Sequence, residues 1–188
     1  MQQRIQYLLN NIKRPGIDKL QAYLDKSDFY TAPASTKYHD SEEGGLAKHS
    51  LKVYENLVLI NDIYDLKLSD ETVIICGLLH DVAKIRFYKN GTRNVNRGGV
   101  WVQEPYYTID DKFPMAHAAK SVYILNEFIH LSVEEAMAIH WHMGLATTDY
   151  TERQTLSRAM EQYPIVLALH TADMQAIYWG GNNNGCRF

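Results

Sequence analysis

The residues of this sequence that could do chemistry are mainly histidines and aspartates. Eight His occur among 188 residues. The sharpest local signal is the dipeptide His80-Asp81, which ends the apolar run in GLLHDVAK. Placing an imidazole and a carboxylate side by side after a buried run costs desolvation energy unless another group compensates. A divalent metal ion would compensate both side chains at once, so the dipeptide is a candidate metal site.

An isolated His-Asp dipeptide is weak support for a metal, because such side chains more often pair with each other or with the backbone. The wider constellation strengthens the interpretation. His49 lies on the most periodic predicted helix and Asp173 on the last one. With His80-Asp81 these residues come from three helices, as a metal site in a helical core requires. A His and carboxylate set without Cys suits manganese, iron(II), magnesium, nickel or zinc, and ligand type alone does not choose among them.

The pattern His49, His80-Asp81, Asp173 resembles the HD-domain metal-dependent phosphohydrolases. The likeness extends over about residues 39–179 and includes GGLAKHSL, GLLHDVAK and LHTAD. The resemblance implies an all-α core in which these four residues bind metal. It also implies that a metal-bound hydroxide attacks phosphorus.

A subset of this family has two further His between the dyad and the final Asp and binds two metals. His117, in FPMAHAAKS, and His142, in HWHMG, match those positions, and Lys84 matches the Lys that follows HDxx. The subset includes cyclic-dinucleotide phosphodiesterases and the HD domain of 3′-to-5′ exoribonucleases. Relatives often have adjacent His where this chain has His140-Trp-His142, and the two side chains lie about 200° apart on a helix. We therefore predict His142 as the ligand and keep His140 as the alternative. The resemblance implies one or two divalent ions as the cofactor, of manganese, iron, magnesium, nickel, cobalt or zinc.

Two metals make physical sense with a carboxylate between them. Cations roughly 3.5–4 Å apart can share a hydroxide and neutralise charge on phosphoryl oxygens. Asp81 is the predicted bridging ligand and a catalytic residue, because its two oxygens can contact two ions. Lys84, one helical turn further on, is the second predicted catalytic residue and would contact a substrate phosphate or hold a carboxylate; a solvated lysine is the alternative. His39 is either a substrate contact or a surface residue.

Helices must carry most of these residues, because the hydrophobic spacing is mainly helical. Ser69 and Ser132 are predicted N-caps, the latter in a capping box with Glu135. Thr151 is expected to cap the next helix, and Pro164 to begin the last. The helices are expected at about residues 3–12, 16–27, 45–65, 115–130, 133–143, 151–162 and 164–178, with an apolar central helix between 69 and 81.

One segment, residues 86–110, interrupts the helical pattern and reads as a β-hairpin with a turn at NRGG. Residues 84–97 carry five positive charges and no acid, so the rest of the chain carries a net −8 within the total of −3. The hairpin also contributes five aromatic residues, namely Phe87, Tyr88, Trp101, Tyr106 and Tyr107. Arg86, Arg93 and Arg97 are therefore predicted phosphate contacts, with aromatic rings available to stack on a base. The alternatives are a solvated edge and an oligomer contact.

Composition excludes several classes of protein. We expect one domain over residues 1–188, with its core at about 39–179. The mild acidity argues against duplex nucleic acid as a partner. The longest apolar stretch, 73–79, is too short for a membrane span. No signal peptide is visible, and two Cys make no disulfide framework, so a soluble, cytoplasmic setting is expected. The oligomeric state does not follow from the sequence.

The most concrete hypothesis is an enzyme: a metal-dependent phosphohydrolase that cleaves a phosphate ester of a nucleotide or small nucleotide-derived substrate. A phosphodiesterase that acts on cyclic (di)nucleotides or RNA 3′ ends is the first alternative. A non-catalytic nucleotide-binding or sensing module is the second, and the complete set of candidate ligands disfavours it, because a pure binder needs no open metal position.

Overall fold

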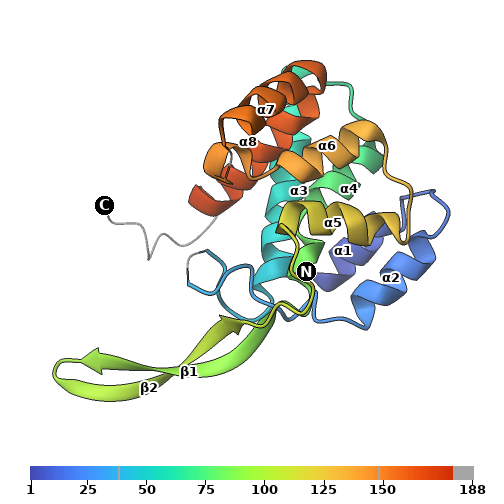
Figure 1. Ribbon diagram of the computed structural model, residues 1–188. Helices are drawn as coiled ribbons and strands as arrows, with labels where there is room; N and C mark the ends of the chain where they lie inside the picture. Colours follow the sequence, from blue (N-terminus) through green and yellow to red (C-terminus); the bar gives the residue numbers. More distant parts are fainter. Residues whose placement is uncertain (38, 148, 180–188) are drawn as a thin grey trace.

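The computed structural model describes residues 1–37, 39–147 and 149–179. Within them the chain forms eight α-helices and one two-stranded antiparallel hairpin, so the predicted helical core with a hairpin insertion is confirmed (Figure 1). None of the described helices is both long and apolar enough to span a bilayer. The elements are α1 (Gln2–Leu9), α2 (Ile17–Asp25), α3 (Gly45–Tyr64), α4 (Asp70–Leu79), β1 (Tyr88–Arg97), β2 (Val100–Ile109), α5 (His117–Asn126), α6 (Val133–Trp141), α7 (Tyr150–Gln162) and α8 (Pro164–Tyr178).

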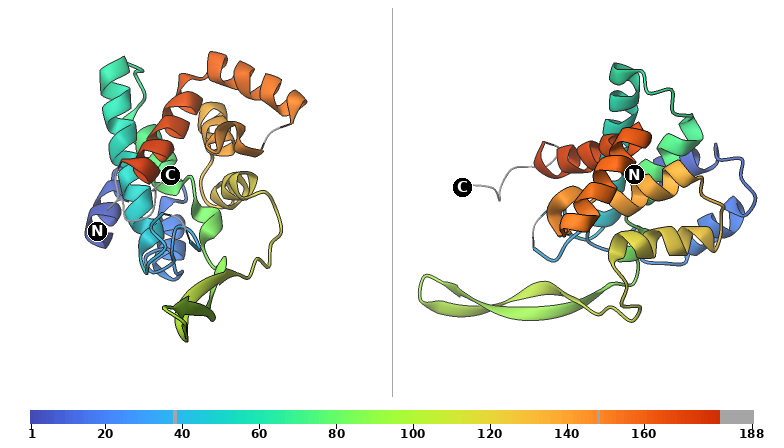
Figure 2. Two further views of the ribbon diagram at one scale, coloured as in Figure 1. Left: turned by 90° about the vertical axis from the view of Figure 1, so that its left-hand side faces the viewer. Right: turned by 45° about the horizontal axis from the view of Figure 1, so that its top comes forward.

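The core is built around α4, α3, α6 and α8. Helix α3 packs against both α4 and α8, and α6 packs against α5 and α8 (Figures 1 and 2). Every residue of α4 from Thr72 to Leu79 is buried, because the run VIICGLL is apolar on all sides. The prediction that this helix is central is confirmed, and its last turn therefore delivers His80-Asp81 into the interior.

Local capping explains where several helices begin. The Ser69 hydroxyl accepts a hydrogen bond from the Thr72 N–H, and Ser132 and Glu135 form the predicted capping box. The expected Thr151 cap is wrong: α7 begins two residues earlier, after Asp149, which forms a capping box with Glu152. A carboxylate at the N-cap with Glu three residues later supplies two reciprocal hydrogen bonds, and this pair determines the start of the helix.

The N-terminal segment is fastened to the core by a partly buried ion pair. The Arg14 guanidinium donates to both oxygens of Glu135 at 2.6 Å and to Glu71 at 2.8 Å. The Glu135 side chain is fully buried, and it also accepts from the Thr72 hydroxyl at 2.9 Å. Burial raises the pKa of Glu135, but the hydrogen bond from Arg14 and the other donors outweigh it and hold the pKa below its usual range. The helices α4 and α6 are thereby tied to the chain before α2.

The hairpin extends away from the helical body as a long arm (Figure 2). Its strands pair in register from Tyr88 opposite Ile109 to Arg97 opposite Val100. Gly98 and Gly99 make the turn, and both have positive φ values, 61° and 92°, as a type I′ turn requires. The turn is the one predicted from NRGG.

Candidate metal centre

The structure brings together six of the residues that the sequence singles out, from five places along the chain. His49 lies on α3, His80 and Asp81 follow α4, and His117 begins α5. His142 follows α6, and Asp173 lies on α8. All of them except His117 are buried.

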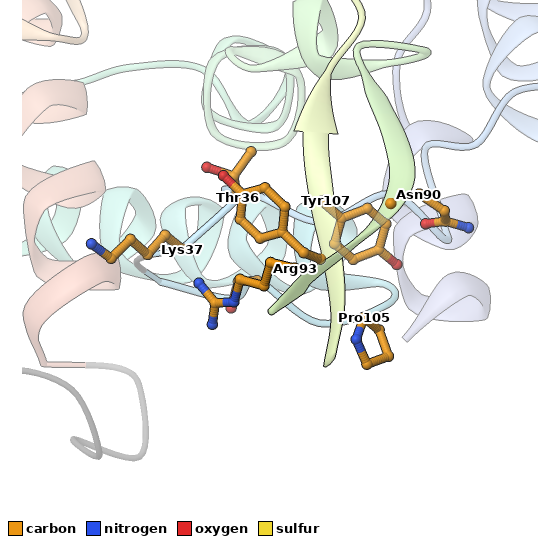
Figure 3. A pocket seen from close by; sticks show the side chains of 9 residues that line it. Thr36, Lys37, Asn90, Arg93, Pro105 and Tyr107 are labelled. Carbon is orange, nitrogen blue, oxygen red and sulfur yellow. The ribbon is translucent and has the colours of Figure 1, made fainter. Parts of the chain in front are cut away.

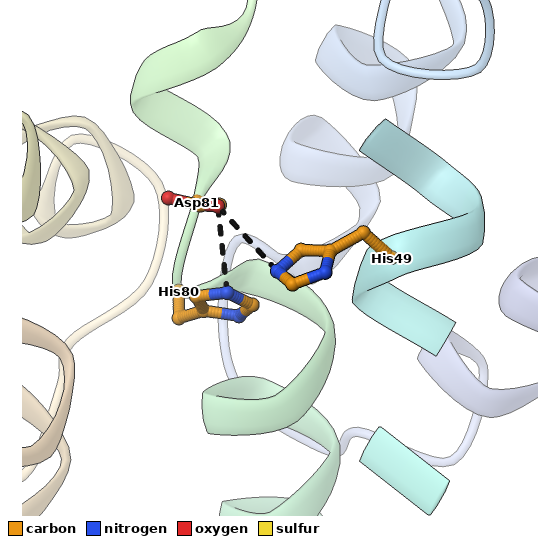
Figure 4. Close-up of side chains that lie close together, drawn as sticks. All are labelled: His49, His80 and Asp81. Carbon is orange, nitrogen blue, oxygen red and sulfur yellow. Dashed lines mark ion pairs between the residues drawn. The ribbon is translucent and has the colours of Figure 1, made fainter. Parts of the chain in front are cut away.

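Asp81 stands between two pairs of imidazoles. Its Oδ2 lies 3.8 Å from Nε2 of His49 and 3.5 Å from Nε2 of His80 (Figure 4). Its Oδ1 lies 3.5 Å from Nε2 of His117 and 3.6 Å from Nε2 of His142. In each of the two groups the possible ligand atoms all lie within 4.8 Å of one another. If two cations were bound, a carboxylate that offers one oxygen to each pair would be shared between them.

Asp173 adds a second carboxylate to one of these groups. Its Oδ1 lies 3.0 Å from Nε2 of His49 and 4.0 Å from Nε2 of His80. The group therefore offers two imidazoles and two carboxylates, whereas the other offers two imidazoles and the shared Asp81. Nitrogen and oxygen donors without thiolate suit first-row divalent ions.

Two of the imidazoles are held by carbonyl groups on their far side. His80 Nδ1 lies 3.0 Å from the Gly77 carbonyl oxygen, and His142 Nδ1 lies 2.7 Å from that of Ile139. A carbonyl only accepts, so each Nδ1–H is the donor, and in the neutral ring each Nε2 keeps a free lone pair on the side of the candidate metal site. Such outer contacts fix the tautomer and ring direction of metal-binding histidines.

Three candidate ligand atoms at the centre are buried without a hydrogen-bond partner. They are His49 Nε2, His80 Nε2 and Asp81 Oδ1. Buried polar atoms in proteins nearly always have a partner, and orphaned atoms demand a reason. Each atom belongs to one of the two groups of candidate ligands, so the donor set fits a divalent metal ion.

Burial and charge favour the deprotonated form of His80, Asp81 and Asp173, whereas at His142 burial is outweighed by the neighbouring carboxylates, which raise its pKa. Burial lowers the pKa of His80 to about 3, so the ring is neutral near pH 7. Burial would raise the pKa of Asp81, but the Lys84 ammonium and nearby imidazoles hold it well below its usual range. For Asp173 burial is likewise outweighed, here by the His49 imidazole, whose Nε2 lies 3.0 Å from Oδ1, and by the other imidazoles nearby, and its pKa is lowered. Metal ligands of these types bind when deprotonated.

A cavity of about 150 Å³ adjoins the cluster. Lys84 lies on its wall, with Nζ 2.7 Å from Asp81 Oδ2. His39 also lines it, with its ring centroid 4.9 Å from that of His49, and burial lowers its pKa to about 4. His170 completes this set, and its Nδ1 donates to the His142 carbonyl at 2.7 Å.

Other predicted residues lie away from this cavity. His140 packs its ring against Trp141 at 4.7 Å between centroids and belongs to neither group of candidate ligands. Arg86 is exposed, and Arg97 pairs with Glu104 at 2.6 Å beside the hairpin turn. Neither arginine lines the cavity over the cluster. Arg93 lines a separate cleft on the hairpin (Figure 3).

Sequence reasoning missed the apolar wall of the cavity. Met174 and Ile177 on α8 line it beside Asp173. Spacing could have found Ile177, since residues four apart share one helix face. Met143 offers no such signal, because it lies beyond the end of α6, where helical periodicity no longer applies.

Comparison with known proteins gives one match. A model of the HD domain family matches residues 46–174, more than half of the chain. The matched segment runs from α3 to α8 and includes all six residues of the cluster. No curated protein and no solved structure matches the chain.

Proposed function

The chain belongs to the HD domain family, and we propose that it is a metal-dependent phosphohydrolase that cleaves a phosphate ester of a nucleotide or small nucleotide-derived compound. The observation that carries this proposal is the position of Asp81, whose two oxygens face two separate imidazole pairs. A structural metal site needs a single closed shell of ligands, whereas a shared carboxylate suits a pair of metals that act on phosphate.

Each group of residues has a distinct role in this proposal. His49, His80 and Asp173 would hold one divalent cation with Asp81, and the two remaining histidines would hold a second with the same carboxylate. When bound, such cations lower the pKa of water and neutralise charge on phosphoryl oxygens. Manganese, iron, magnesium, nickel, cobalt and zinc are all compatible with these ligands.

Lys84 supplies positive charge at the edge of the cluster. Its ammonium contacts Asp81 and lies on the cavity wall. Burial lowers the pKa of Lys84, but the Asp81 carboxylate more than compensates and raises it, so the side chain is charged at neutral pH. A fixed ammonium at this place orients Asp81 and would stabilise charge that develops on a bound phosphate.

The size of the cavity bears on what enters it. Sites for whole small molecules usually measure about 300–1,000 Å³, and this cavity measures about 150 Å³. It therefore suits the phosphoryl end of a substrate, with the sugar and base outside. His39 and His170, at its wall, are placed to contact the atoms next to the phosphate.

A panel of substrates tests the proposal. The purified protein, loaded with manganese, is incubated with nucleoside mono-, di- and triphosphates, cyclic dinucleotides and short oligonucleotides, and products are separated by chromatography. We expect at least one ester to be hydrolysed by the wild type and not by Asp81→Asn. Full metal occupancy with no turnover of any substrate would refute the proposal that the protein is a phosphohydrolase. Tight nucleotide binding in that case would indicate the sensing module instead.

The same panel of substrates distinguishes a phosphatase that acts on phosphate monoesters from a phosphodiesterase. A phosphodiesterase that acts on cyclic (di)nucleotides or RNA 3′ ends is the second candidate, because the cleft on the hairpin offers room for a further part of a substrate. Release of inorganic phosphate from nucleotides favours the first candidate, and release of mononucleotides from longer substrates favours the second.

A further inference from the structure

A second cleft lies outside the metal cavity, between the hairpin and the loop before α3. It measures about 500 Å³. One wall comes from the two strands and the other from the loop (Figure 3). The lining residues on which the inference rests are Lys37, Asn90, Gly91, Arg93, Tyr106 and Tyr107.

The charge in this cleft is concentrated on Arg93. Its guanidinium lies 5.2 Å from the centroid of the Tyr106 ring. Its closest approach to Glu104 is 4.0 Å, whereas Arg97 contacts the same carboxylate at 2.6 Å. Arg97 is thus the main partner of Glu104, and the half-exposed Arg93 keeps N–H groups for an anion. Lys37 adds a second cation on the facing wall.

The cleft also presents aromatic rings. Tyr106 pairs across the hairpin with Gly91, so its partner on the facing strand adds no side chain beside the ring. A glycine within a strand often marks a place where a ligand approaches closely. Tyr107 and its partner Asn90 line the same cleft, with a second ring and an amide. Rings that stack on a base, beside a cation that binds phosphate, are the usual components of a single-strand binding site.

The cleft and the metal cavity lie beside the same loop. Tyr88, at the hairpin base, donates its hydroxyl hydrogen to the Ala34 carbonyl at 3.0 Å. Lys37 in this loop lines the cleft, and His39 lines the cavity. Arg93 is five residues along the strand from Tyr88, or about 16 Å at the rise of a β-strand. A ligand that contacts both Arg93 and the metal cavity therefore extends along the hairpin beyond its base.

We propose that the hairpin cleft binds the phosphate and base of an outer nucleotide, and that the substrate is a short single-stranded oligonucleotide whose end enters the metal cavity. This inference rests on the proposed function. A single strand is required because stacking on Tyr106 needs an unpaired base. The acidic remainder of the chain offers no broad surface for a duplex.

The test measures binding without catalysis. Fluorescence anisotropy follows a labelled single-stranded hexanucleotide with the metal-free full chain in EDTA. Arg93→Ala removes the cation, and Gly91→Val fills the space opposite Tyr106 with a residue that strands favour. We expect each to weaken binding at least tenfold. Lys89 lies on the same hairpin, is exposed and does not line the cleft. Lys89→Ala therefore removes one positive charge outside the cleft and should change binding less than twofold. The salt dependence should fall by about one ion for Arg93→Ala and stay unchanged for Gly91→Val.

Three outcomes would overturn the inference: no binding of the hexanucleotide by the wild type, wild-type binding by both cleft variants, or an equal loss with Lys89→Ala. Equal affinity for a duplex of the same length would also contradict it. Hydrolysis of the substrate panel by the manganese-loaded wild type is a separate measurement that tests the proposed function. Oligonucleotide binding at the cleft can be refuted while the hydrolase proposal stands. If no substrate is hydrolysed, the binding comparison of the variants still tests the cleft.

Discussion

Substitution of Gly77 by Ala should separate the two helices that carry the metal site. A Cβ at residue 77 would lie 2.5 Å from Cα and 3.1 Å from N of Tyr54, both backbone atoms of α3. Ordinary contact begins at 3.4 Å, so the helices must move apart by about 1 Å. His49 lies on α3, and His80 follows the end of α4 and donates to the Gly77 carbonyl. The separation should therefore pull the ligands apart.

The expected magnitudes differ for stability and for metal binding. Overpacking costs about 1–3 kcal/mol, and Ala gains about 1 kcal/mol over Gly in a helix, so unfolding free energy should fall by about 2 kcal/mol or less. Metal affinity should fall about 10- to 100-fold, as when a contact that positions a ligand is lost. Urea unfolding in EDTA and manganese titration calorimetry measure the two effects. Leu59→Ala, on the exposed side of α3, is the control and should leave manganese affinity unchanged. Wild-type manganese affinity in Gly77→Ala would refute the reasoning.

Three further predictions concern buried groups. Arg14→Met leaves the carboxylate of Glu135 buried without its cation, so unfolding free energy in urea should fall by about 3–5 kcal/mol; a loss below about 1 kcal/mol would show that the pair does not fasten the N-terminal segment. His142→Ala should remove one manganese ion per chain and His140→Ala none, as measured by equilibrium dialysis; equal losses would contradict the assignment of the ligand. The pKa of His80 falls from 6.5 to about 3 on folding, so the unfolded chain binds a proton in this range that the folded chain does not. The stability that this difference in pKa contributes is fully present above pH 6.5 and is lost as the pH falls toward 3. Near pH 5 in EDTA the unfolding free energy of His80→Gln should therefore change with pH less steeply than that of the wild type, by about 1.4 kcal/mol per pH unit. Parallel pH profiles of the two proteins would contradict the lowered pKa of His80.

Local signals in the sequence predicted the helical framework well. Periodicity located α3, and the apolar run before His80 indicated a buried helix that ends at the dyad. The Ser132 capping box is encoded within four residues. Such features depend on neighbours along the chain, and for that reason they can be read without a structure. Thr151 shows the limit of this approach: it and Asp149 both suit an N-cap, and the reciprocal bond from Glu152 decides between them.

Features that depend on distant contacts could not be predicted. Each oxygen of Asp81 lies near a different pair of imidazoles, and this arrangement follows from the packing of five elements. The spacing of the motifs along the sequence does not predict it. Arg93 and Arg97 look equivalent in the sequence. Only the strand register shows that Glu104 lies opposite Arg93 while Arg97 contacts it more closely. The position of His170 likewise depends on the carbonyl of a residue in another helix–turn segment.

The central claim is that Asp81 is shared by two divalent cations, and manganese stoichiometry tests it most directly. Equilibrium dialysis of the wild type and of Asp81→Asn, at one concentration of free manganese, gives the number of ions bound per chain. We predict two ions for the wild type and a loss at both positions in the variant. A wild type that binds no manganese or only one ion, or a variant that keeps two, would contradict the claim.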